Sequence, residues 1–176
     1  MSMPEIKIPP GANYTAADVR FMQGMIHHHA QALKMAAMAR THGAGPSVQL
    51  LCQKIDVSQK DEIAMMSTWL KDRNQTVPDP NDPHPMMMPG MLTDAQLAAL
   101  DQARDTTFDR LFLTGMIQHH QGAIQMVKDL FATPGAGQAS EIFRFASDVD
   151  VDQRGETQRM QAMLASPTHS VSTHAQ

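Results

Sequence analysis

Apolar residues recur every three or four positions in four long stretches of this chain, which predicts four long amphipathic helices. They are expected at about residues 15–42, 47–73, 106–133 and 138–165, with a shorter helix at about 93–104. No segment alternates apolar and polar residues as a half-buried strand does. The pattern therefore predicts an all-α protein.

Turn and cap residues mark the ends of these helices. The expected N-caps are, in chain order, Thr15, Ser47, Thr93 and Thr106. Thr15 with Asp18 and Thr93 with Gln96 have the spacing of a capping box. A Gly-Ala-Gly-Pro run at 43–46 and Pro-Gly at 134–135 should end the first and third long helices. Residues 74–91 hold five prolines and no periodicity, so they should form a long connection.

An internal repeat indicates how the helices pair. Residues 21–29 (FMQGMIHHH) match residues 112–120 (FLTGMIQHH) at an offset of 91 residues (112 − 21). Residues 55–59 (IDVSQ) match 149–153 (VDVDQ) at an offset of 94 (149 − 55), and Glu62 and Glu156 follow at equivalent places. Two copies of a helix-turn-helix unit predict two hairpins that bury their apolar faces against each other in a four-helix bundle.

The expected organisation is one domain with five segments. These are an extended arm at 1–14, a first hairpin at 15–73, a Pro/Met-rich linker with a short helix at 74–105, a second hairpin at 106–165 and a flexible tail at 166–176 that carries His169 and His174.

Composition and charge exclude several classes of protein. The 176 residues are 42% hydrophobic and 18% charged, which is typical of a globular domain with a sizeable core. A net charge of -4 without runs of like charge offers no basic surface to nucleic acid. No apolar stretch approaches the ~20 residues that span a bilayer, so no membrane insertion is expected. The first residues lack a signal region, which leaves a cytoplasmic protein or the mature form of an exported one.

The sulfur-containing residues raise the question of metal. The single cysteine, Cys52, excludes an internal disulfide and a Cys-based metal site, and its place on an apolar face predicts a buried thiol. The chain has 16 Met and 9 His. Methionine fills irregular cores, but its thioether is also a soft ligand that selects Cu(I). Composition alone leaves both interpretations open.

The repeated motif places sulfur beside imidazole on one helix face. Met at position i with His at i+3 and i+4 makes a feasible site for copper. The chain has this arrangement twice: Met25 with His28 and His29, and Met116 with His119 and His120. A lone histidine on an apolar stripe is more often a hydrogen-bonded core residue, but a doublet repeated at equivalent positions indicates a shared role, structural or metal-binding. His27 should point away from this face.

Polar residues on the second and fourth long helices could meet these histidines. Gln59 and Glu62, with their repeats Gln153 and Glu156, fall on otherwise apolar stripes. A buried carboxylate must be paired or bound to a metal. We therefore expect Glu62 and Glu156 to contact the histidines inside the bundle, either to orient the imidazoles or to join a metal site directly.

Secondary ligands are expected elsewhere. The extended linker segment could cover a groove of the bundle or act as a flexible strand that captures a soft metal. Its candidate ligands are His84, Met86, Met87 and Met88, and those of the long helices are Met22, Met35, Met38 and Met126. Met22 and Met38 should lie near the surface, whereas Met65 should be packing.

The paired GMIHHH and GMIQHHQGAIQM segments, each followed by a helix with Q-x-x-E-x-x-x-M, resemble the bacterial domain of unknown function 305 family over residues 15–165. The resemblance implies a ferritin-like four-helix bundle and export to the periplasm or beyond. Because one member is a periplasmic copper binder rich in Met and His, it also implies copper, as Cu(I) or Cu(II), at the two Met/His-His motifs. His27, which extends the first doublet to a triplet, departs from the family pattern.

Three functions follow from these observations. The first is a copper-binding protein that sequesters or transfers the ion without catalysis, with metal ions and a metal-exchanging protein as partners, as a monomer or homodimer. The second is a di-metal oxidase, but none of Glu5, Glu62, Glu141 and Glu156 begins the Glu-x-x-His motif of such enzymes. The third is an interaction module whose His/Glu pairs fix helix register without metal. No nucleophile elbow or Gly-rich phosphate loop is present.

Overall fold

The computed structural model describes residues 5–166, so the first four residues and the expected tail with His169 and His174 lie outside it. Its helices are α1 Ala16–Ala37, α2 Pro46–Asp72, α3 Asp94–Gln102, α4 Asp105–Ala132 and α5 Ser140–Ala165, with a short 3₁₀ turn, η1, at Met38–Arg40. Residues 5–166 contain no strand, which confirms the all-α prediction for that part of the chain. None of these helices is long and apolar enough to cross a membrane.

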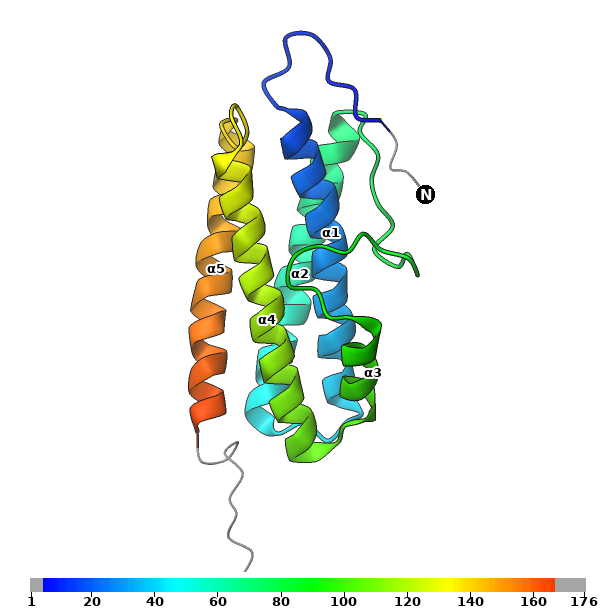
Figure 1. Cartoon of the computed structure of the whole chain (residues 1–176), viewed down its shortest axis with the longest axis vertical. Coiled ribbons are helices and arrows are strands. Elements are labelled where there is room, and N and C mark those ends of the chain that lie inside the picture. The colour runs from blue at the N-terminus through cyan, green and yellow to red at the C-terminus, as the bar shows by residue number, and fades with distance from the viewer. Residues whose placement is uncertain (1–4, 167–176) are drawn as a thin grey trace, which may run out of the picture.

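The four long helices lie side by side as two antiparallel hairpins (Figure 1). α1 pairs with α2, α4 pairs with α5, and the hairpins meet along α1 and α4. The short α3 packs against α4. This is the arrangement expected when each amphipathic hairpin buries its apolar face against the other.

The core has two apolar halves separated by a polar layer. One half contains Met25, Met66 and Met126, and the other contains Met35, Met116 and Met160. Each of the four long helices passes from one half to the other, and its polar positions fall between them. The residues of this polar layer are His27, His28, His29, Gln31, Gln59, Glu62, His119, His120, Gln153 and Glu156.

Several predicted helix ends are confirmed and others are wrong. Both capping boxes, at Thr15 and Thr93, are present. Ser47 is not an N-cap, because α2 begins one residue earlier with Pro46 in its first turn, a position that proline favours. Thr106 is not one either, because Arg104 is the N-cap of α4. The first helix ends at Ala37 and tightens into η1 instead of continuing to residue 42.

The linker between the hairpins passes in front of α1 about halfway along its length and reaches the side of α4 (Figure 1). Gly90, with φ +78°, lies directly on Gly122 of α4, where an added Cβ would be 1.9 Å from the Pro89 carbonyl oxygen. Gln31 of α1 holds the same segment, because its amide donates to the Leu92 carbonyl (3.0 Å) and accepts from the Leu92 N–H (2.8 Å). The linker therefore covers the polar layer on this side of the molecule.

Candidate metal centre

Two histidines from different hairpins stack at the centre of the polar layer. The ring centroids of His28 and His119 are 3.7 Å apart, with the planes tilted by 33°. His28 Nε2 donates to the Pro89 carbonyl (3.0 Å), and His119 Nε2 donates to the backbone carbonyl of His28 (2.8 Å). Because a carbonyl only accepts, both rings carry their hydrogen on Nε2 and keep a lone pair on Nδ1.

Both stacked rings are held neutral by their surroundings. Burial lowers the pKa of His28 to about 3, with a further lowering from His29 and His120 that the carbonyls of Pro89 and His119 oppose. Burial, followed by the neighbouring His28, lowers the pKa of His119 well below its usual range. A neutral imidazole is the form that binds metal ions.

The outer two histidines are paired with glutamates. His29 Nε2 lies 3.4 Å from Glu62 Oε2, and His120 Nε2 makes a closer contact with Glu156 Oε1. The expected contact between the histidines and the glutamates is thus confirmed. The imidazoles are fully buried, whereas the Glu62 and Glu156 side chains are 16% and 17% exposed. The carboxylates therefore lie between the buried layer and the outer surface of α2 and α5.

Four imidazole nitrogens of this layer have no hydrogen-bond partner: His27 Nε2, which carries a hydrogen, and three Nδ1 atoms. The Nδ1 atoms of His29, His119 and His120 are buried without a hydrogen bond. Buried polar atoms are rarely left unpaired, so each of these nitrogens calls for an explanation. The sulfur-bearing Met25 and Met116, fully buried, lie one helical turn from the doublets. These atoms fit a soft or borderline metal ion.

The described part of the layer does not bring three imidazole, thiol or carboxylate ligands together at one point. Within residues 5–166, no three or more His, Cys, Asp or Glu side chains are close enough together to hold one metal ion. The repeated motif supplies a different donor set, imidazole nitrogen combined with thioether sulfur. Such a set suits an ion that accepts few and soft ligands, as Cu(I) does.

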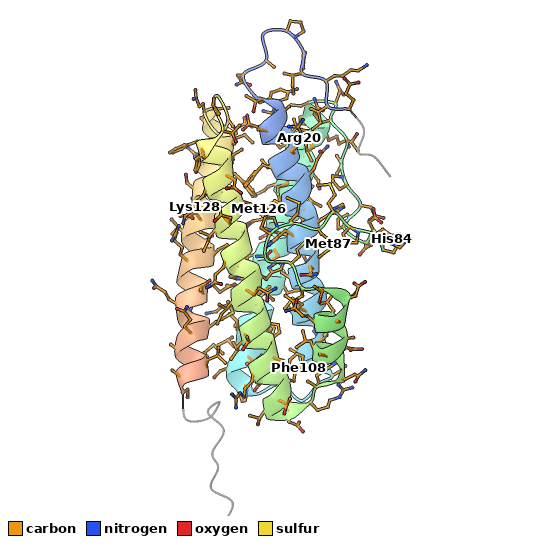
Figure 2. The ribbon with its side chains drawn as sticks, viewed as in Figure 1. Arg20, His84, Met87, Phe108, Met126 and Lys128 are labelled. Carbon is orange, nitrogen blue, oxygen red and sulfur yellow. The ribbon has the colours of Figure 1, made fainter. Side chains whose placement is uncertain are left out.

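The methionines occupy several depths. Met35 and Met126 are buried at repeat-related positions. Met88 and Met126 both lie over Gly24, where an added Cβ would be 2.7 Å from Met88 Cε and 3.5 Å from Met126 Cε. Met87 is 62% exposed on the linker, and His84 lies further out on the same segment (Figure 2).

Two expectations about methionine are wrong. Met22 is buried rather than near the surface, because Trp69 and Phe145 lie beside it where α2 and α5 face each other. Met65 is 57% exposed rather than packed, since it borders a groove that these two helices leave open. Met38 is half-buried.

His27, which is expected to point away from the face of the doublets, contacts the linker. It is buried against the linker, and its Nδ1 accepts a hydrogen bond from the Met86 N–H (2.8 Å). Its hydrogen must then be on Nε2, so this ring fastens the linker and offers no lone pair to a metal. The sequence did not predict the roles of Gln31, which hydrogen-bonds to the linker, and Gly122, against which the linker packs. These two positions are equivalent in the repeat (122 − 31 = 91) but carry a glutamine and a glycine, and this difference could have drawn attention to them.

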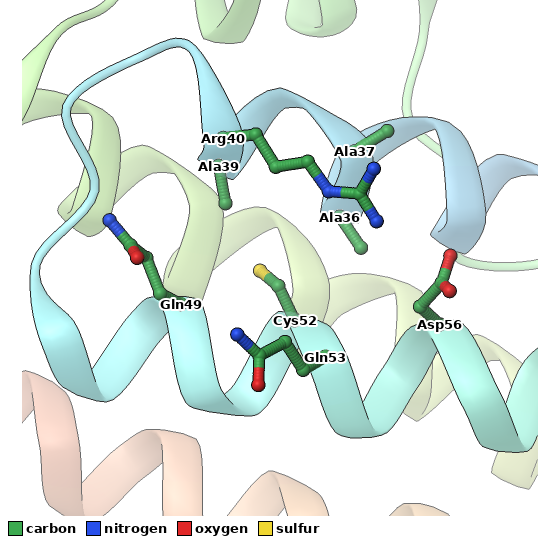
Figure 3. A pocket seen from close by; sticks show the side chains of 8 residues that line it. All are labelled: Ala36, Ala37, Ala39, Arg40, Gln49, Cys52, Gln53 and Asp56. Carbon is green, nitrogen blue, oxygen red and sulfur yellow. The ribbon is translucent and has the colours of Figure 1, made fainter.

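Cys52 lies outside the polar layer. It borders a hollow of about 60 Å³ between α1 and α2, together with Ala36, Arg40 and Asp56 (Figure 3). Burial raises the pKa of this thiol to about 12, and the charges of Asp109 and Glu156 add to the effect. The expected buried thiol is confirmed, and at neutral pH it is protonated.

Comparison with known proteins places the chain among helical proteins of the same shape. A family model described as domain of unknown function (DUF305) matches residues 18–164. A DUF305 fragment from Deinococcus radiodurans is 33% identical with a TM-score of 0.75, and the match covers 86% of this chain and 97% of that one. A DUF305 protein from Streptomyces coelicolor, provisionally described as secreted, is 28% identical with a TM-score of 0.75, covering 88% and 94%.

CopM in its Cu(I)-bound form is 29% identical to this chain, with a TM-score of 0.67, and the match covers 84% of this chain and 95% of CopM. Matching CopM structures also include Cu(II)-bound and silver-bound forms. No curated protein sequence matches the chain.

Proposed function

The chain belongs to the DUF305 family, and from that premise we propose that it is a copper-binding protein that sequesters or transfers the ion and catalyses no reaction. Cu(I) is the favoured state because thioether and neutral imidazole are soft to borderline ligands. The copper-bound and silver-bound forms of CopM support the choice of metal. The proposal includes a ferritin-like class of bundle and a periplasmic or secreted location, which the Streptomyces coelicolor relative supports.

The observation that carries this proposal is the set of unpartnered Nδ1 atoms of His29, His119 and His120. Their Nε2 atoms are already engaged, by Glu62, a backbone carbonyl and Glu156 respectively. A hydrogen-bonded Nε2 fixes the ring orientation of a metal-binding histidine and raises the basicity of the other nitrogen. The glutamates thus act behind the imidazoles, which would leave nitrogen and sulfur to hold the ion.

The linker would supply the route by which copper reaches the layer. Met87 on the surface and Met88 against the core present sulfur at two depths of one segment. Met126 lies beside Met88, so a soft ion captured outside would meet a further thioether inside. Transfer between exposed weak ligands and buried ones suits a protein that exchanges its ion with a partner.

Anaerobic titration with Cu(I) against a chromophoric competing chelator tests the proposal. The informative variant is Met25→Leu with Met116→Leu, since exchange of Met for Leu keeps the volume and costs less than about 1.5 kcal/mol per site. It should lower the number of tightly bound ions. The matched control, Met66→Leu with Met160→Leu, changes two other fully buried methionines and should bind copper as the unchanged protein does.

Two outcomes would contradict copper binding at this layer. One is a protein that takes no Cu(I) from the chelator, and the other is an equal loss in the control variant. The hydrogen-bonded His/Glu pairs also favour a second candidate, an interaction module in which they only fix helix register. In that case copper would leave the melting temperature unchanged, because only a ligand that binds the native state raises it.

A further inference from the structure

An open groove runs between α2 and α5, on the side of the bundle away from the linker. The close helix contacts are α1 with α2, α4 with α5 and α1 with α4. Between α2 and α5 lies a groove of about 390 Å³, separate from the groove that Met65 borders. Its position matters because both glutamates of the polar layer line it. The layer is therefore accessible from a second direction.

The groove is lined by oxygen-bearing side chains from repeat-related residues. Gln59 and Glu62 of α2 face Gln153 and Glu156 of α5, and Ser58 and Asp152 also line the groove. Partial burial raises the pKa of Asp152, and the charges of Glu62, Asp148 and Glu156 raise it further. The groove therefore has a negative potential where these side chains meet. The cations Lys54 and Arg159 lie one helical turn away, at one end.

The two glutamines point to a missing partner. Their side chains are only 2% and 4% exposed, and the Oε1 atoms of Gln59 and Gln153 have no hydrogen bond. A buried carbonyl oxygen without a donor costs stability. The carboxylates beside them are oriented by His29 and His120, each through one oxygen. The side chains of both glutamines and both glutamates thus line the groove, and the two amide oxygens, which lie beneath its accessible surface, have acceptor capacity to spare.

We propose that this groove binds a hard divalent cation of the calcium, magnesium or manganese class, held by Glu62, Glu156, Gln59 and Gln153. Carboxylate, amide carbonyl and water are the ligands that these ions take. The set contains only two acidic side chains, so it is compatible with the lack of any group of three His, Cys, Asp or Glu ligands in residues 5–166. The site uses oxygen alone and does not depend on copper binding.

Thermal unfolding of the chelator-treated full chain tests the proposal, with calcium, magnesium or manganese chloride added separately and sodium chloride at equal ionic strength as the reference. At a hundredfold excess over Kd, a bound cation should raise the melting temperature by about 5–10 °C. The rise should vanish in Gln59→Leu with Gln153→Leu. Without cation, this variant should melt no lower than the unchanged protein, because its unpaired carbonyls are gone.

The matched control is Gln53→Leu with Gln158→Leu, the same change at exposed positions of the same two helices outside this groove. It should keep the full cation response. The proposal is overturned if no divalent chloride raises the melting temperature above the sodium reference, or if both Leu variants respond equally. Cu(I) titration of the Gln59/Gln153 variant separates this result from copper binding, which should persist there.

Discussion

Gly122→Ala should lift the linker away from the polar layer. A Cβ at this position would lie 1.9 Å from the Pro89 carbonyl oxygen and 2.6 Å from Gly90 Cα. Both are backbone atoms, so no side-chain rotation can relieve the clash and the linker must move. Movement of Pro89 breaks the hydrogen bond that its carbonyl accepts from His28.

The expected loss of stability follows from these contacts. Overpacking at a close contact costs about 1–3 kcal/mol. Removal of the acceptor of a buried donor costs about 1–3 kcal/mol more. The better helix propensity of alanine offsets about 1 kcal/mol of this. We therefore expect the free energy of unfolding to fall by roughly 1–5 kcal/mol.

Equilibrium unfolding in urea measures this change, and Gly155→Ala is the matched control. Gly155 is also within a helix, α5, but an added Cβ there meets no atom within 4 Å. The control should gain about 0.5–1 kcal/mol, as helical Gly→Ala exchanges do. If Gly122→Ala is as stable as the control, the linker does not lie against α4 at Gly122.

A second measurement on the same variant reports on His28. Burial is the main cause of its low pKa of about 3. Lifting the linker exposes the imidazole of His28, so its pKa should rise towards 6.5, the ordinary value for histidine. An NMR titration of the imidazole that shows no such rise would mean that the linker is not what covers it.

Three further predictions follow. In the native protein the pKa values of His28 and His119 lie below 6.5, so these residues bind protons more readily in the unfolded chain. The free energy of unfolding should therefore fall as the pH drops from about 6.5 towards 3, by up to about 1.4 kcal/mol per pH unit for each residue. Urea unfolding across this range should give a shallower slope for His119→Phe, and an unchanged slope would contradict the assignment. Gln31→Ala leaves the buried N–H and carbonyl of Leu92 unpaired and should cost at least about 2 kcal/mol in the same assay; a loss under half of that would mean that water replaces the amide. Cys52, with its pKa raised to about 12, should resist Ellman's reagent in the native protein and react fully in urea, whereas rapid native reaction would show an accessible thiol.

Features that repeat along the chain could be predicted from it. The all-α class follows from apolar periodicity, and both capping boxes follow from the spacing of Thr15 with Asp18 and of Thr93 with Gln96. The contact of His29 with Glu62 could be anticipated because a carboxylate on an apolar stripe needs a partner. The repeat then implied the same contact for His120.

Features that depend on contacts with another hairpin or with the linker could not be predicted from the sequence. The periodicity of one helix shows which face is buried but not where another hairpin stops covering it, so Met22 and Met65 were assigned to the wrong depth. The crossing of the linker is a contact of backbone with backbone, at Gly90 and Gly122, and side-chain patterns do not encode it. The contact of His27 with the linker was not predicted for the same reason, since its partner is the N–H of Met86.

The central claim is that copper is held by the imidazoles and thioethers of the polar layer. The most direct test is an anomalous difference map, at the copper absorption edge, from crystals of the protein loaded with Cu(I). We expect a peak inside the bundle, bonded to an Nδ1 atom of the histidine doublets and to the sulfur of Met25 or Met116. Copper found only at exposed residues such as His84 and Met87, or no peak at all, would contradict it.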